Sequence, residues 1–332
     1  MSYLNNLFHE FATKRILVVG DVMIDSYLRG RVNRVSPEAP VPIVSLDKEE
    51  DRLGGAANVA LNLVALGAKP VICSVIGTDK QAKRFHELSE QAGISSEGLV
   101  SSSDRSTTVK TRVIGNNQQL LRIDSEQVDL ISKEEEHQLI AKAEELMNGS
   151  IDAVIFEDYN KGVLTPNVIS SIIALASNRN IPTAVDPKKE HFFEYKGVTL
   201  FKPNLKELRE GLNLPFHFHP TDKHAFEAAV TELETRLENK ISFVTLSEHG
   251  VYIREGENRH YAEAHPRTIA DVSGAGDTVI AVATLCLACG VRVPEIAEMA
   301  NIAGGLVCES SGVIPIDKEQ FMSEARRLMK VK

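Results

Sequence analysis

The sequence lacks both a long hydrophobic run and a run of basic residues. Its apolar segment Val279 to Val291 is shorter than the roughly 18–20 residues that cross a bilayer, so we expect a core helix there and no membrane segment. The formal net charge is −9. Because no basic stretch offsets this charge, we expect no nucleic-acid partner.

Cysteine is also scarce, with four residues in the chain and no paired framework. Such usage is typical of a reducing compartment, and no secretory signal precedes the first predicted strand. Cys286 and Cys289 have C-x-x-C spacing, but they lie within an apolar helical stretch, which favours core packing over a redox or zinc site. We therefore expect a cytoplasmic protein.

Two common phosphate-binding motifs are missing as well. The chain has no G-x-x-x-x-G-K-[ST] sequence, which argues against a P-loop kinase. It has no G-x-G-x-x-G after the first predicted strand, where Gly20 stands alone, and this argues against a dinucleotide-binding dehydrogenase. A phosphate site in this protein must be built in another way.

What the sequence does contain is a regular alternation of buried strands and helices. Hydrophobic content is 43% over 332 residues, so we expect a single domain spanning 1–332. The predicted strands are 15–19, 70–76, 151–156, 182–185, 198–201 and 241–246, and the predicted helices include 56–66, 80–92, 133–147, 166–177 and 223–237. This pattern predicts an α/β sandwich with a mainly parallel central sheet, in which ligands collect at the carboxyl ends of the strands.

Two segments, 25–46 and 106–124, break this alternation. Both have polar, alternating β patterns with no helix between adjacent strands, and both follow early strands of the sheet. They predict either a small separate β sheet that projects over the site as a lid or ordinary surface hairpins. A lid would exclude water from the site and so limit wasteful hydrolysis.

The segment Asp271 to Thr278 reads Asp-Val-Ser-Gly-Ala-Gly-Asp-Thr and leads into the apolar helix. Glycines at a helix start leave backbone amides exposed at the positive end of the helix dipole, which suits an anion. Asp277 stands where a base beside a phosphate is needed, and we expect the helix terminus to lower its pKa. The alternative is that Asp277 merely caps the helix.

A second glycine motif, Gly54-Gly55-Ala56-Ala57-Asn58, lies more than two hundred residues upstream. The two motifs in this order resemble those of the ribokinase-like (PfkB) carbohydrate kinases. Further stretches are similar to the heptose-7-phosphate 1-kinases of that superfamily: 20–25, 35–42, 157–164 and 271–278. The resemblance covers nearly the whole chain and implies a ribokinase-like fold with a β lid.

The resemblance also implies a role for each motif residue. Asp277 would be the catalytic base, and the amides of Gly274, Ala275 and Gly276 would stabilise the transferred phosphate. The expected substrate-binding residues are Asp21, Asp25, Gly54, Gly55, Asn58, Glu157, Asp158 and Lys161. The expected ATP-binding residues are Asn204, Leu205, Lys206, Glu207, Ser247, Gly250 and Asn301, with Glu207 and Asp186 reaching Mg²⁺ through water.

Two of these assignments have plain alternatives. Asn204 and Glu207 have the spacing of a helix capping box as well as of a nucleotide site. The loop carrying Glu157, Asp158 and Lys161 could be a solvated turn. For a phosphate at the far end of the sugar, the sequence does not rank the candidates Lys161, Lys188, Arg34 and Arg112.

The implied reaction is transfer of phosphate from MgATP to the anomeric hydroxyl of D-glycero-D-manno-heptose 7-phosphate, giving the 1,7-bisphosphate for ADP-heptose synthesis. The alternatives are another ribokinase-like kinase, acting on ribose, fructose or a fructose phosphate, or a non-catalytic sugar- or nucleotide-binding protein. We expect a homodimer formed through the lid. We expect no nucleotidyltransferase domain in 1–332, so a separate enzyme would carry out that step.

Overall fold

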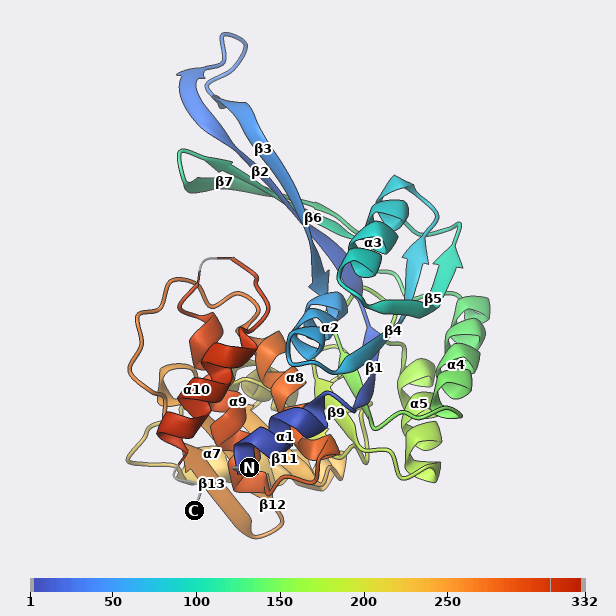
Figure 1. Cartoon of the computed structure of the whole chain (residues 1–332), viewed down its shortest axis with the longest axis vertical. Coiled ribbons are helices and arrows are strands. Elements are labelled where there is room, and N and C mark those ends of the chain that lie inside the picture. The colour runs from blue at the N-terminus through green and yellow to red at the C-terminus, as the bar shows by residue number, and fades with distance from the viewer. Residues whose placement is uncertain (1–2, 311, 330–332) are drawn as a thin grey trace.

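The computed structural model describes residues 3–310 and 312–329, and its centre is a nine-stranded sheet (Figure 1). The strand order is β13-β12-β11-β10-β9-β8-β1-β4-β5, and the strands from β5 to β11 run parallel. The predicted, mainly parallel sheet is therefore confirmed. Its strands are β1 (Arg15–Gly20), β4 (Lys69–Gly77), β5 (Ser95–Ser102), β8 (Ala153–Glu157), β9 (Thr183–Asp186), β10 (Leu200–Phe201), β11 (Ile241–Thr245), β12 (Val251–Glu255) and β13 (Asn258–Ala262).

Helices cover both faces of this sheet and form two hydrophobic cores. In β1, Ile16 and Val18 pack into one core, while Leu17 and Val19 pack into the other. A continuous apolar run is what a strand buried on both sides requires. One core contains α1 (Tyr3–Phe11), α2 (Ala56–Ala65), α3 (Lys80–Gln91), α8 (Ala275–Ala288), α9 (Val293–Val307) and α10 (Lys318–Leu328); the other contains α4 (Lys133–Met147), α5 (Pro166–Asn178), α6 (Leu205–Leu212) and α7 (His224–Leu237).

The second sheet has four strands in the order β3-β2-β6-β7, and we call it the lid. It consists of β2 (Val22–Val35), β3 (Pro42–Gly55), β6 (Val109–Gly115) and β7 (Gln118–Ser125). Figure 1 shows the β2–β3 hairpin projecting well away from the body. The separate small sheet predicted from the sequence is confirmed, although β2 and β3 are longer than predicted, so that Gly54 and Gly55 end a strand.

Some elements were not anticipated from the sequence. The start of the chain looked polar, yet α1 buries Leu4, Leu7, Phe8 and Phe11 on one face. The hairpin of β12 and β13 and the helices α9 and α10 were also missed, whereas α8 begins at Ala275, within the glycine motif where a helix start was expected. All four cysteines are free, and Cys286 is buried in the core. None of the helices in the described part of the chain has the length and apolarity that a bilayer crossing requires.

Candidate active site

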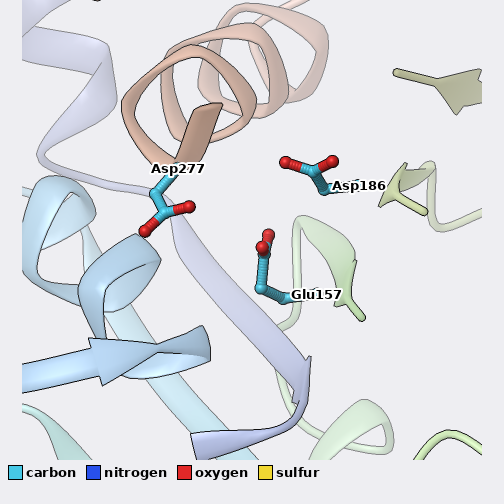
Figure 2. Close-up of side chains that lie close together, drawn as sticks. All are labelled: Glu157, Asp186 and Asp277. Atoms are coloured by element: carbon cyan, nitrogen blue, oxygen red, sulfur yellow. The ribbon is translucent and has the colours of Figure 1, made fainter. Parts of the chain in front are cut away.

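Three buried carboxylates meet at the carboxyl ends of the parallel strands (Figure 2). Glu157 ends β8, Asp186 ends β9, and Asp277 lies in the first turn of α8. One oxygen from each lies within 4.8 Å of the others. We call these three residues the carboxylate cluster. The sequence predicted a role for each residue but did not predict that they would meet.

The start of α8 presents Asp277 and the neighbouring amides. Gly274 caps the helix at φ 81°, in the left-handed region that favours glycine. A Cβ added there would come within 3.1 Å of Asn58 Nδ2, so the position is also crowded. The amides of Gly276 and Asp277 belong to the first helical turn, which offers them no intrahelical acceptor. The terminus therefore has free donors and a positive dipole end for an anion.

Two hydrogen bonds hold the Asp277 carboxylate. Asn58 Nδ2 donates to Oδ2 at 2.5 Å, and the Tyr159 hydroxyl donates to Oδ1 at 2.9 Å. Burial raises the pKa of Asp277 to about 6; Asp186 adds to the rise, while the bonds from Asn58 and Tyr159 oppose it. The low pKa expected from the helix terminus is therefore wrong, because burial among carboxylates outweighs the dipole.

The other two carboxylates of the cluster differ in their partners. Asp186 pairs with the buried Lys202 ammonium at 2.7 Å, whereas Glu157 Oε2 is buried and has no hydrogen-bond partner among the described residues. Burial, together with Asp186 and Asp277, holds the pKa of Glu157 well above its usual range. Oxygen ligands of this kind are those that Mg²⁺ prefers, so the donor set fits this ion. Glu157 and Asp186 would hold it.

Glu207, the other residue predicted to reach Mg²⁺ through water, forms part of a helix cap. Asn204 Oδ1 accepts from the Glu207 amide at 2.8 Å, and Glu207 Oε2 accepts from the Asn204 amide at 2.9 Å. Its Oε1 accepts from Lys188 Nζ at 2.7 Å. Both oxygens of Glu207 are thus engaged within the protein. The capping box that the spacing also allowed is present, whereas Glu157 lies beside Asp186 in the carboxylate cluster.

A cavity of about 730 Å³ opens next to the start of α8. Its lining includes three residues predicted to contact ATP, namely Ser247 and Gly250 from one loop and Asn301 from α9, together with Gly276 of α8. Gly250 has φ 86°, and a Cβ there would come within 2.0 Å of the Ala262 carbonyl oxygen. The size falls within the usual range for ligand cavities. Leu205 and Lys206 line a neighbouring cleft with Asn204 and Ser247.

On the lid side, Asp25 lies against the glycine pair at the end of β3. A Cβ on Gly54 would come within 2.2 Å of Asp25 Oδ2, and Gly55 has φ 60° with the Asp21 carbonyl oxygen 2.4 Å from its Cβ position. Position 55 therefore requires glycine, and a side chain at Gly54 would displace the Asp25 carboxylate. Asp25 is buried and pairs with the Arg112 guanidinium. The structure thus brings Asp25 and the glycine pair together at the base of the lid.

The remaining predicted substrate residues are engaged in holding their own loop. Asp21 accepts from the amides of Tyr159, Lys161 and Val163 at 2.8, 3.1 and 3.2 Å. Asp158 accepts from the Tyr195 hydroxyl at 2.9 Å, and burial raises its pKa to about 6. Lys161 Nζ pairs with Glu126 at 2.8 Å. This geometry gives Asp21 and Asp158 an organising role that the sequence did not suggest.

Sequence reasoning assigned no role to Tyr159 or Lys202. Tyr159 lies inside a stretch used for the family resemblance, and Lys202 precedes the Pro203-Asn204 pair. Nothing in the pattern distinguished these two side chains from ordinary loop residues. Only the fold, which brings distant segments to Asp277 and Asp186, reveals them.

Comparisons with known proteins identify the family of the chain. A model of the pfkB family of carbohydrate kinases matches residues 13–319. The D-beta-D-heptose 7-phosphate kinase of Bordetella bronchiseptica is 40% identical over 320 residues, covering 95% of this chain and 97% of that protein. The bifunctional protein HldE of Methylobacillus flagellatus is 40% identical over 325 residues, covering 97% of this chain. The chain spans 66% of the length of that protein.

Solved structures show the same fold at low sequence identity. Phosphofructokinase-2 from Escherichia coli, solved with potassium, has a TM-score of 0.77 and 18% identity, covering 95% of this chain and 100% of that one. The ribokinase of Arabidopsis thaliana, solved with ribose and ATP, has a TM-score of 0.71 and 17% identity, covering 93% of this chain and 99% of that one. The predicted ribokinase-like architecture is confirmed.

Proposed function

Because the chain belongs to the pfkB family of carbohydrate kinases, we propose that it transfers the γ-phosphate of MgATP to the anomeric hydroxyl of D-glycero-D-manno-heptose 7-phosphate. The name of the Bordetella relative supports this acceptor. The observation that carries the proposal is the buried Asp277 carboxylate in the first turn of α8, beside amides that have no helical partner. A base next to an anion site is what phosphoryl transfer requires.

Each group at the site would have its own role in the reaction. Asp277 would accept the proton of the attacking hydroxyl as the new O–P bond forms and the bond to ADP breaks. The amides around Gly276 would stabilise the charge on the transferred group. Mg²⁺ held by Glu157 and Asp186 would neutralise phosphate charge. The products are ADP and the 1,7-bisphosphate, with the proton left on Asp277.

On the substrate side, Asp25 would accept hydrogen bonds from sugar hydroxyls, and the glycine pair at 54–55 would let the sugar approach the backbone. Within residues 3–310 and 312–329, Asn58 Oδ1 is buried without a partner, so it is an available acceptor for a further hydroxyl. The cavity lined by Gly250 and Asn301 would hold the nucleotide.

We further propose that two copies of the chain pair through the lid. On the side of the lid opposite Asp25, Leu28 lies beside Val113, Val113 beside Leu121, and Thr111 beside Ile123. Leu121 is 48% exposed and Ile123 is 54% exposed. A second copy covering this apolar surface would remove it from water. Leu121→Asp should then yield monomers in sedimentation experiments; dimers that persist in this variant would contradict the lid interface.

The test of the activity is ADP release with MgATP and one of five additions: heptose 7-phosphate, fructose 6-phosphate, ribose, fructose, or no sugar. Turnover confined to the heptose phosphate would establish acceptor and reaction together. Turnover on another sugar would keep the kinase and discard the heptose assignment. If no sugar supports turnover while ATP and a sugar still bind, a non-catalytic binding protein becomes the better description.

A further inference from the structure

A second buried asparagine, Asn62, lies one helical turn after Asn58 in α2, on the same side of that helix. Asn58 is 1% exposed and Asn62 is 0% exposed. The residues that α2 buries around Asn62 are mostly apolar and include Val59 and Leu63. A side-chain amide in such surroundings costs stability unless its donors and acceptor are satisfied. The partners of Asn62 therefore show what this amide is used for.

The amide of Asn62 bonds to three segments of the chain. Its Nδ2 donates to the Asn58 carbonyl at 2.9 Å, within α2. Its Oδ1 accepts from the Thr278 hydroxyl of α8 at 2.9 Å and from the Ile316 amide at 3.0 Å. The Thr278 hydroxyl also lies 3.2 Å from the Gly274 carbonyl, but a hydroxyl has one proton and the shorter contact is to Asn62. One side chain thus joins α2 to the first turn of α8 and to the segment between α9 and α10.

The same two helices also meet at the site itself. Asn58 Nδ2 donates to Asp277 Oδ2 at 2.5 Å, and Asp277 directly precedes Thr278. Two side-chain bonds therefore join α2 to α8, one at the carboxylate of Asp277 and one behind it in the core. Because these bonds lie one turn apart on α2, they restrict rotation of the helices about each other, which a single bond permits. The fit is close, since a Cβ on Gly274 would come within 3.1 Å of Asn58 Nδ2.

We propose that Asn62 and Thr278 are positioning residues, and that the bond between them holds α2 and α8 so that the base keeps its hydrogen bond from Asn58. This inference rests on the proposed function, since it takes Asp277 as the base. Asn62 and Thr278 are both 0% exposed, so they would act through their neighbours and not on the substrate. A displacement of about 1 Å in a reacting group can lower turnover about 10²-fold, so a buried bond that fixes two helices can control kcat.

The test uses two buried threonines of α8, Thr278 and Thr284. Thr278→Val keeps the shape of the side chain and removes its hydroxyl, whereas Thr278→Ser keeps the hydroxyl. Thr284→Val is the matched control, because the Thr284 hydroxyl donates to the Ile280 carbonyl of its own helix at 2.7 Å. In Thr278→Val, Asn62 Oδ1 still accepts from the Ile316 amide, so its acceptor stays satisfied and the protein should fold.

We expect Thr278→Val to lower kcat on heptose 7-phosphate about 10-fold while the KM for ATP changes less than about twofold. Thr278→Ser and Thr284→Val should keep kcat within about twofold of the wild type. A threonine that only fills the core would give the reverse order. Thr278→Ser, which loses a methyl group, would then lower the Tm, and Thr278→Val would leave kcat unchanged.

Crystal structures of the wild type, Thr278→Val and Thr284→Val give a readout that needs no turnover. The contact between Asn58 and Asp277 should lengthen beyond the usual range of about 2.7–3.2 Å in Thr278→Val and stay within it in Thr284→Val. Either an unchanged contact or an unchanged kcat in Thr278→Val would overturn the inference. A wild type that turns over no sugar, with a lengthened contact in Thr278→Val, would contradict the proposed function and still support the positioning of the two helices.

Discussion

The carboxylate cluster at the base of the site, which we call the floor, is acidic and buried, whereas the lid carries basic residues that are partly exposed. On the floor, the carboxylate cluster of Glu157, Asp186 and Asp277 is buried, and the buried cation Lys202 pairs with Asp186. On the face of the lid that carries Asp25, arginines such as Arg52 are partly exposed; the exposed fraction of the Arg52 side chain is 27%. Buried charge is costly, so it is kept where chemistry needs altered proton affinities. An exposed charge keeps most of its hydration, so it costs little stability and suits a surface that binds a ligand.

The largest effect should come from removing the base on the floor. Asp277→Asn keeps the shape and both neighbours but cannot accept a proton, so kcat should fall about 10³-fold or more. ATP affinity should stay close to that of the wild type, because the cavity beside α8 is untouched. The measurement is steady-state turnover with a parallel ATP titration. Substantial remaining turnover would refute the assignment of Asp277 as base.

The next largest effect concerns stability of the same cluster. Lys202→Met leaves the buried Asp186 carboxylate without its cation, and breaking such a pair costs about 3–5 kcal/mol of unfolding free energy. Urea denaturation measures this. Lys206→Met is the control, because the Lys206–Glu210 pair is on the surface and should contribute less than about 1 kcal/mol. Equal losses of unfolding free energy in the two variants would mean that the buried Lys202–Asp186 pair contributes no more stability than the surface pair.

Substitution of a sugar-binding residue in the lid should change KM more than kcat. Asp25→Asn should raise the KM for the sugar roughly 10- to 100-fold, because a charged acceptor of hydroxyl hydrogen bonds becomes a neutral amide, while kcat changes less. Asp51→Asn is the matched control on the opposite face of the lid, where Asp51 pairs with Arg84. A fall in kcat with an unchanged KM would place Asp25 in the chemistry instead of in sugar binding.

The pH dependence of kcat/KM should reflect the burial of Asp277. Asp277 must be ionised to accept a proton, and its pKa is raised to about 6, so kcat/KM should fall as the pH drops through about 6. Tyr159→Phe removes a donor that favours the ionised form, so the acid limb should move to higher pH. Tyr195→Phe removes a similar bond from Asp158 and should leave the limb in place. An acid limb near pH 4 in the wild type would contradict the burial argument.

The same contrast explains what could be predicted from the sequence. Strands such as β1 and β8 were predicted because a strand covered on both faces is a short apolar run. The lid was predicted because polar and apolar residues alternate along its strands. The raised pKa of Asp277 was not foreseen, since it depends on burial and on Asp186, which another strand brings close. Local spacing alone also could not decide whether Asn204 and Glu207 bind nucleotide or cap a helix.

The smallest predicted effect addresses that last ambiguity. Asn204→Ala removes one side of the capping box of α6 and should cost about 1 kcal/mol of unfolding free energy. Ser132→Ala removes the equivalent contact in α4, where Ser132 and Glu135 form a second capping box. If Asn204 only caps its helix, both variants lose similar stability and neither changes the KM for ATP. If Asn204 also contacts the nucleotide, its variant alone raises that KM, because Ser132 is not among the described residues that line the cavity beside α8 or the neighbouring cleft. Thermal melts and ATP kinetics on the same two proteins therefore separate a structural role from a binding role at a position where the sequence motif allows both.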